Sequence, residues 1–213
     1  MQETLSQHKG IWKNRDFVSS VVVAFLLLAL SITFNFFAGN FAIKRASNSV
    51  SDLLLDNLPF IDTTFVFIYG AYLLIVFIGF LLFFRPEKIA FVVKNIALFI
   101  FIRAVFVTLT HLGEPISGID VYSNYVLSKF TFGADLFFSG HTGLPYLMAL
   151  ICWKEKLWRN LFLVSSVVLA GSALLGRAHY SIDIFAAYFI TYSIFHIAQV
   201  IFKKDYELTK QKQ

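Results

Sequence analysis

Two short segments of this 213-residue chain hold the residues best suited to chemistry. The first is 135–142, which reads Asp-Leu-Phe-Phe-Ser-Gly-His-Thr, and the second is 179–183, which reads His-Tyr-Ser-Ile-Asp. Each segment places a histidine and a carboxylate at the edge of a strongly apolar stretch. Two imidazoles and two carboxylates suit the transfer of a phosphoryl group, in which one histidine attacks phosphorus and the other moves protons.

The spacing within the second segment predicts a contact between its two ionisable side chains. His179 and Asp183 are four residues apart, so on a helix they lie on one face, one turn from each other. A carboxylate beside one ring nitrogen fixes the tautomer and leaves the other nitrogen free to attack phosphorus. The alternative is a pair that merely caps a helix. Because ionisable groups are scarce in membrane spans, we favour the functional interpretation.

The first segment predicts a helix start that could bind phosphate. Ser139 is a good N-cap, and Gly140 allows a ligand to approach the backbone closely. The N-terminus of a helix presents N–H groups and a positive dipole end, which suit an anion. His141, on the first turn, could protonate a leaving oxygen or deprotonate an incoming one. An ordinary serine cap beside an interfacial histidine remains the alternative.

Two arginines are candidate phosphate ligands. Arg103 interrupts an apolar run, where an unpaired arginine costs at least ~2.5 kcal/mol. Arg177 precedes His179 by two residues. A guanidinium group can bind phosphate through two parallel hydrogen bonds. The alternatives are an internal salt bridge from Arg103 to a carboxylate such as Asp135, and an interfacial position for Arg177 with its charge in water.

The composition indicates an integral membrane protein. Hydrophobic residues make up 58% of the chain and charged residues 15%, which is too little polar surface for a soluble domain of this length. The net charge of +5 is better explained by membrane topology than by nucleic-acid binding. The single Cys152 excludes an internal disulfide and a cysteine-built metal site. By residue type alone, His141, His179, Asp135 and Asp183 could still form a metal site.

Six apolar runs approach the ~20 residues that a spanning helix needs. They are residues 17–38, 63–84, 89–110, 136–153, 160–176 and 183–202. The sequence therefore predicts an all-α integral membrane protein, a bundle of six transmembrane helices. We divide it into a cytoplasmic N-terminal segment (1–16), a membrane catalytic domain (17–202) and a basic cytoplasmic tail (203–213).

The distribution of charge predicts the orientation of these spans. Basic residues gather in the N-terminal segment, the second and fourth loops and the tail, whereas those on the opposite side are offset by acidic residues. The positive-inside rule then puts both termini in the cytoplasm and both histidine segments at the outer face. Lys94, near the inner end of its run, is expected to extend its amine to the membrane surface. Abundant Phe, Ile, Lys and Asn with compact loops favour a bacterial inner membrane protein whose site faces the periplasm. In a eukaryote the same face would be lumenal or extracellular.

The second half of the chain resembles a known family. Asp-x-x-x-Ser-Gly-His-Thr, followed by His-Tyr-Ser-x-Asp-Ile-x-x-x-Tyr, is similar to the sphingomyelin synthase branch of the phosphatidic acid phosphatase type 2 superfamily, over roughly residues 103–196. The resemblance implies that His179 is the nucleophile and forms a phosphohistidine, that Asp183 orients it, and that His141 is the general acid and base. It also implies an outward-facing site with no metal or other cofactor.

The sequence departs from this family at three places. Gly133-Ala134-Asp135 stands where the synthases usually have Cys-Gly-Asp, and the third span lacks the Lys–Arg–Pro motif of the phosphatases. Ser172-Ala173 stands where the phosphatases have Ser-Arg. The chain is therefore closer to the synthases. The expected substrate and phosphate contacts are Asp135, Ser139, Gly140, Arg103, Arg177 and Tyr180.

We therefore expect a lipid phosphotransferase that moves a phospho-headgroup from a phospholipid to the hydroxyl group of ceramide or diacylglycerol. If water is the acceptor, the same histidines make a lipid phosphate phosphatase or a phospholipase C-type hydrolase. A transporter is the alternative from another class, but the ionisable groups cluster at one face and no inverted repeat is visible. The expected partners are the donor, the acceptor and the bilayer, with no nucleic acid; assembly of several copies stays open.

Overall fold

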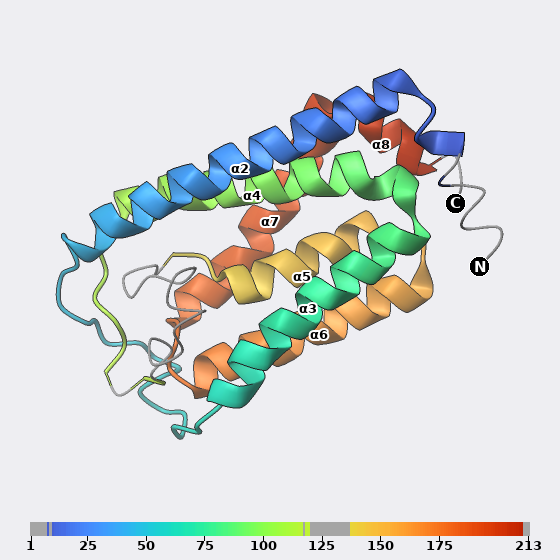
Figure 1. The fold of residues 1–213 in the computed structure, drawn as a ribbon. Helices are drawn as coiled ribbons and strands as arrows, with labels where there is room; N and C mark the ends of the chain where they lie inside the picture. The colour runs from blue at the N-terminus through green and yellow to red at the C-terminus, as the bar shows by residue number, and fades with distance from the viewer. Residues whose placement is uncertain (1–7, 9, 117, 120–136, 211–213) are drawn as a thin grey trace.

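The chain folds into a bundle of helices. The computed structural model describes residues 8, 10–116, 118–119 and 137–210, and this part is helical, without strands. Figure 1 shows the bundle. Its helices are α2 (Arg15–Ile43), α3 (Thr64–Phe84), a 3-10 turn η1 (Pro86–Lys88), α4 (Ile89–Leu109), α5 (Gly140–Ile151), α6 (Lys156–Leu175), α7 (Ser181–Ile201) and α8 (Lys203–Lys210).

Five of the helices are long and apolar enough to cross a membrane: α2, α3, α4 with η1, α6 and α7. The prediction of several apolar membrane helices is thus confirmed. The run at 136–153 gives a shorter helix, because α5 has 12 residues between Ser139 and Cys152. At 1.5 Å per residue α5 is about 18 Å long, less than the roughly 30 Å of a hydrocarbon core. The count of six spans and the cytoplasmic termini therefore remain predictions.

The short helix α5 lies inside the bundle. It packs against α6 and α7, while α2 packs along α4 and α3 along α6. Figure 1 shows α5 between the α2–α4 pair and the α3–α6 pair, with α7 crossing behind it. Leu147 and Met148 of α5 are fully buried in one core with Phe91 and Phe99 of α4. Many outer side chains of the long helices are apolar and exposed, as expected of helices that face lipid.

The two ends of the bundle differ. We call one the loop end; it holds residues 44–63, 110–116 and 118–119 and the link 176–180 between α6 and α7. We call the other the tail end; it holds the start of α2, η1 and α8 (Figure 1). Both histidine-bearing helix starts, those of α5 and α7, lie at the loop end.

A buried ion pair fastens the C-terminal segment to the tail end. Lys94 Nζ of α4 lies 2.6 Å from Asp205 Oδ2 of α8, and Ser20 of α2 bonds both side chains. Lys94 is only 8% exposed, so the expectation that its amine extends to the membrane surface is wrong. The physical reason is the counter-charge that α8 brings, since a buried charge is tolerated when it is paired.

Candidate active site

At the start of α7 the side chains of His179 and Asp183 contact each other. Asp183 Oδ2 lies 3.2 Å from His179 Nδ1 and accepts a 3.0 Å hydrogen bond from the N–H of Tyr180. Asp183 is fully buried, and His179 is 6% exposed. Since a carboxylate can only accept, the Nδ1 atom carries the proton and the Nε2 lone pair is left for chemistry. Asp183 therefore caps the helix and orients the imidazole at the same time.

The start of α5 is joined to the start of α7. The N–H of Ser139 donates to the backbone carbonyl oxygen of Asp183 at 3.0 Å. Ser139 occupies the N-cap position, as predicted, but its side chain makes no capping bond. Its hydroxyl oxygen is buried and has no hydrogen-bond partner among the described residues. This hydroxyl group is a candidate contact for a ligand.

Arg103 and His141 meet at the same place. Arg103 Nε donates to the carbonyl oxygen of Phe138 at 3.1 Å, and a side chain at Gly140 would lie 3.6 Å from that nitrogen. The His141 ring stacks on Phe67 of α3, with ring centroids 3.8 Å apart. Arg103 and His179 are both close enough to His141 to act on it electrostatically. Arg103 of α4, His141 of α5 and His179 of the link before α7 thus bring a cation and two imidazoles to one site.

Both turns that lead into the histidine-bearing helices contain a strained residue. Phe138 has a φ of 25° and Arg177 a φ of 52°, and these are the non-glycine residues of positive φ in the described part of the chain. Such backbone costs of order 1–3 kcal/mol and is concentrated at functional sites. The two strained residues stand directly before the site, Phe138 next to Ser139 and Arg177 two residues before His179.

Tyr180 faces the loops. It is 1% exposed; its hydroxyl group donates to the carbonyl oxygen of Gly113 at 2.8 Å and accepts from the N–H of Val50 at 3.1 Å. Burial raises the pKa of the Tyr180 phenol, and the hydrogen bond from Val50 acts in the opposite direction. The hydroxyl group of Tyr180 therefore bonds the backbone of two loops. We had expected this side chain to contact phosphate.

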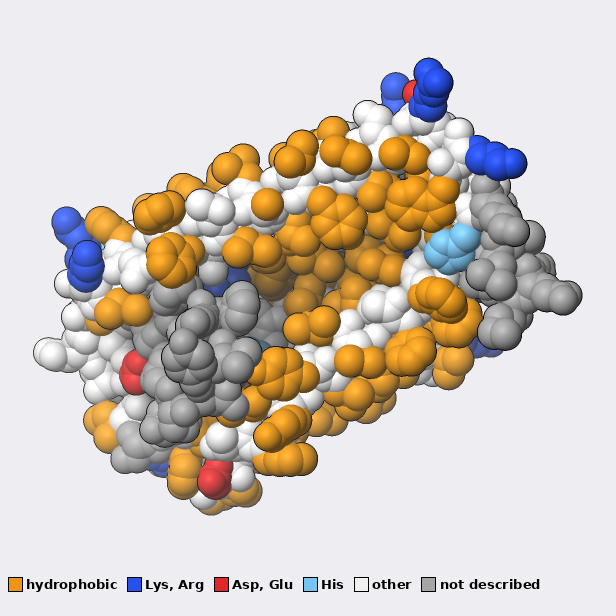
Figure 2. Space-filling view, viewed as in Figure 1, with side chains coloured by type: hydrophobic (Ala, Val, Ile, Leu, Met, Phe, Trp, Pro, Cys, Tyr) orange, Lys and Arg blue, Asp and Glu red, His pale blue; other side chains and the backbone are white. Residues whose placement is uncertain are grey.

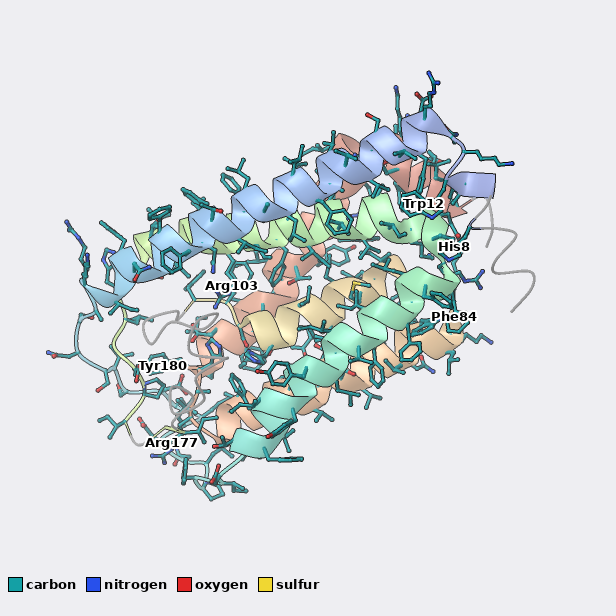
Figure 3. All side chains as sticks on the ribbon, in the orientation of Figure 1. His8, Trp12, Phe84, Arg103, Arg177 and Tyr180 are labelled. Atoms are coloured by element: carbon teal, nitrogen blue, oxygen red, sulfur yellow. The ribbon has the colours of Figure 1, made fainter. Side chains whose placement is uncertain are left out.

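Arg177 also contacts the loops. Its guanidinium group donates to the carbonyl oxygens of Ile116 and Leu55, each at 3.4 Å. Figure 3 shows Arg177 and Tyr180 at the loop end, with Arg103 between α4 and α5. Of the predicted phosphate contacts, Arg103, Ser139 and Gly140 thus lie beside the histidines. Asp135 lies outside the described residues.

Asp52 is a part of this region that the sequence did not reveal. One carboxylate oxygen, Oδ2, accepts from the N–H and the hydroxyl group of Ser181 at 2.7 and 2.8 Å. The other, Oδ1, accepts from the N–H groups of Leu54 and Leu55. Burial acts to raise the pKa of Asp52, but these hydrogen bonds outweigh it and hold the pKa below its usual value. No local pattern around Asp52 signals a partner 129 residues away.

The described residues include no group of three or more His, Cys, Asp or Glu side chains placed to hold a metal ion. Asp135, which the four-residue metal alternative requires, lies outside them. Of the other three residues, His141 stacks on Phe67, and His179 and Asp183 form a hydrogen-bonded pair.

Comparison with known proteins gives one match. A family model described as PAP2 superfamily C-terminal matches residues 132–200, a stretch that includes both histidine segments. No curated protein and no solved structure matches the chain. The match agrees with the phosphatidic acid phosphatase type 2 motifs noted in the sequence. Residues 132–200 of the chain are therefore similar to the C-terminal part of the PAP2 superfamily.

Proposed function

We propose that the protein is a lipid phosphotransferase similar to the sphingomyelin synthases. It transfers a phospho-headgroup from a phospholipid to the hydroxyl group of ceramide or diacylglycerol, through a phosphohistidine on His179. The observation that carries the proposal is the buried pair in which His179 Nδ1 lies 3.2 Å from Asp183 Oδ2. This pair leaves the Nε2 lone pair as a nucleophile and provides a carboxylate that stabilises the positive charge of the attacking ring.

In the first step His179 Nε2 attacks the phosphorus of the donor. A nitrogen–phosphorus bond forms, and the bond from phosphorus to the diacylglycerol oxygen breaks. His141 donates its proton to that oxygen, so diacylglycerol leaves as a neutral alcohol. The Phe67 ring on which His141 stacks fixes the plane of the imidazole during this transfer.

In the second step the acceptor hydroxyl group takes the place of the departed lipid. His141, now neutral, removes its proton while the oxygen attacks phosphorus, and the bond to His179 Nε2 breaks. Both histidines return to their starting protonation states. One difficult displacement is thus divided into two easier ones, and His141 serves as the acid in the first and as the base in the second.

The negative charge of the phosphoryl group requires donors in both steps. We assign Arg103, the Ser139 hydroxyl group, which has no partner among the described residues, and the N–H groups that follow Gly140 to this role. Asp135 remains a proposed substrate contact. Arg177 and Tyr180 instead keep the loops around the site in place, because their polar atoms are engaged with loop backbone.

The surface of the bundle supports a lipid as the substrate. Figure 2 shows an apolar hollow on one face, between the α2–α4 pair and α3. In the same view, Arg103 lies toward its loop end (Figure 3). A donor lipid could thus keep its acyl chains in the hollow while its phosphate reaches Arg103. We further propose that the loop end faces the periplasm of a bacterial inner membrane.

Lipid profiling by mass spectrometry tests this function. The purified protein is placed in liposomes of phosphatidylethanolamine, phosphatidylcholine, phosphatidic acid and ceramide. We expect a ceramide that carries a phospho-headgroup, with an equal amount of diacylglycerol. The product disappears in His179→Ala and persists in His196→Ala, a matched control because His196 is exposed on α7, the helix that follows His179, and contacts Gln199.

The other outcomes separate the alternatives. Diacylglycerol with free phosphate or a free phosphorylated headgroup, and no new lipid, identifies water as the acceptor and replaces the transferase with a hydrolase. No loss of headgroup in any liposome contradicts both enzymatic activities and favours a transporter.

A further inference from the structure

Asp52 connects a distant loop to the helix that positions His179. Its carboxylate accepts four hydrogen bonds, two from Ser181 and two from the backbone of its own loop. The side chain of Asp52 is thereby fixed on both oxygens, and Asp52 is 9% exposed.

The link that carries His179 is anchored on both sides. Before it, the N–H groups of Ala178 and His179 point to the carbonyl oxygen of Ala173, at 2.9 and 3.4 Å. After it, the N–H of Tyr180 donates to Asp183 and that of Ser181 donates to Asp52. The first N–H groups of a helix have no backbone partner within the helix, so Asp183 bonds one of them from the first turn of α7 and Asp52 bonds another from a distant loop.

The first turn of α7 also sets the position of α5. The carbonyl oxygen of Asp183 accepts from the N–H of Ser139, two residues before His141. A shift in the first turn of α7 therefore changes the distance between the two histidines as well as the direction of the His179 ring. A misplacement of about 1 Å can reduce a catalysed rate 100-fold.

We propose that Asp52 is a positioning residue for the His179–Asp183 pair and acts through Ser181. It touches neither substrate nor reacting atoms. It fixes the peptide group between Tyr180 and Ser181, so that Nε2 of His179 stays directed at the phosphorus. The inference rests on the proposed function where it concerns the rate of headgroup transfer. Where it concerns the order of the first turn of α7, it rests on the hydrogen bonds alone.

A competing interpretation is that Asp52 only stabilises the fold by holding residues 44–63. Both interpretations predict a less stable Asp52 variant. They differ in the rate of each folded molecule, because a purely structural residue leaves that rate unchanged. A positioning role predicts that the loss of kcat grows along the series Ser181→Thr, Ser181→Ala and Asp52→Asn. A purely structural role predicts the same kcat per folded molecule in all three variants.

The kinetic test measures kcat and KM of headgroup transfer per folded protein in liposomes. Asp52→Asn should lower kcat about 10- to 100-fold with KM within about two-fold of wild type. Ser181→Ala, which keeps the N–H, should have a smaller effect, and Ser181→Thr, which keeps the hydroxyl group, should be close to wild type. Asp62→Asn is the control in the same loop, because Asp62 is exposed and accepts a hydrogen bond from the N–H of its near neighbour Thr64. Ser193→Ala is the control on α7, where the hydroxyl group bonds the carbonyl oxygen of Phe189.

The structural test is hydrogen exchange of peptides that cover residues 176–184. Asp52→Asn should exchange faster there than wild type, and Asp62→Asn should not. A kcat per folded Asp52→Asn molecule equal to that of wild type overturns the proposal, and so does unchanged exchange. If the wild-type protein transfers no headgroup, the proposed function fails, whereas exchange still decides whether Asp52 orders the start of α7.

Discussion

The N–H of Ser139 donates to the carbonyl oxygen of Asp183 at 3.0 Å, which ties together the helix starts that carry His141 and His179. One hydrogen bond thus connects the proposed acid–base group to the proposed nucleophile through backbone atoms. Backbone contacts survive most side-chain substitutions, so variants in the site should fold and still report on chemistry.

Asp183→Asn should nearly abolish activity while leaving the fold in place. The amide has the same shape as the carboxylate but has no charge to stabilise the ring of His179 when it gains positive charge. Loss of the corresponding carboxylate in a serine–histidine–aspartate triad costs about 10⁴-fold in kcat, and we expect a loss of that order. Headgroup transfer at saturating donor measures it. A loss smaller than about ten-fold would mean that Asp183 only caps α7.

Arg103→Lys should lower kcat/KM by at least about ten-fold. Lysine keeps the positive charge but cannot donate two parallel hydrogen bonds to a phosphate group. Arg159→Lys is the control, since Arg159 lies at the other end of the bundle beside Trp153. Steady-state kinetics with varied donor concentration provide the measurement. Equal kcat/KM in Arg103→Lys and wild type would remove Arg103 from phosphate binding.

Lys94→Met should destabilise the protein by about 3–5 kcal/mol, because it leaves the carboxylate of Asp205 buried without a partner. The double variant Lys94→Met with Asp205→Leu should recover most of that loss, since two apolar side chains then replace the ion pair. Thermal unfolding in detergent gives the difference in Tm. A double variant no more stable than Lys94→Met would contradict the pairing.

The stabilising effect of Asp52 should depend on pH. Hydrogen bonds hold the folded pKa of Asp52 below the unfolded value of about 3.9, so its contribution is fully present above that value and is lost as the pH falls through the folded pKa. The unfolding free energies of wild type and Asp52→Asn should therefore differ at pH 7 and converge below about pH 4. A difference that stays constant from pH 7 to pH 3 would show that the carboxylate charge does not stabilise the fold.

Local patterns predicted the parts of the site that depend on neighbouring residues. The four-residue spacing of His179 and Asp183 predicted a contact that the structure shows at 3.2 Å. His179 lies in the link before α7, however, so the contact forms because Asp183 reaches back over the helix start, where it also accepts from the N–H of Tyr180. The position of Ser139 at a helix start followed from cap preferences in the same way. Apolar length also located the five long helices.

Long-range partners could not be predicted in this way. Lys94 and Asp205 are 111 residues apart, and Asp52 and Ser181 are 129 apart, so only the packed bundle brings them together. The helix predicted at 136–153 is present as α5 but is shorter, because hydropathy does not show where a helix ends. Tyr180 follows His179 directly in the chain, yet its side chain takes another direction and bonds Gly113 and Val50.

The central claim is that His179 carries the phosphoryl group, and trapping that intermediate tests it most directly. The p-nitrophenyl ester of phosphocholine needs no acid to release its leaving group, so His141→Gln should complete the first step and stall before the second. We predict one nitrophenolate per protein molecule and a phosphocholine adduct on the peptide that contains His179. Continuous turnover without an adduct, or an adduct on any other residue, would contradict the account.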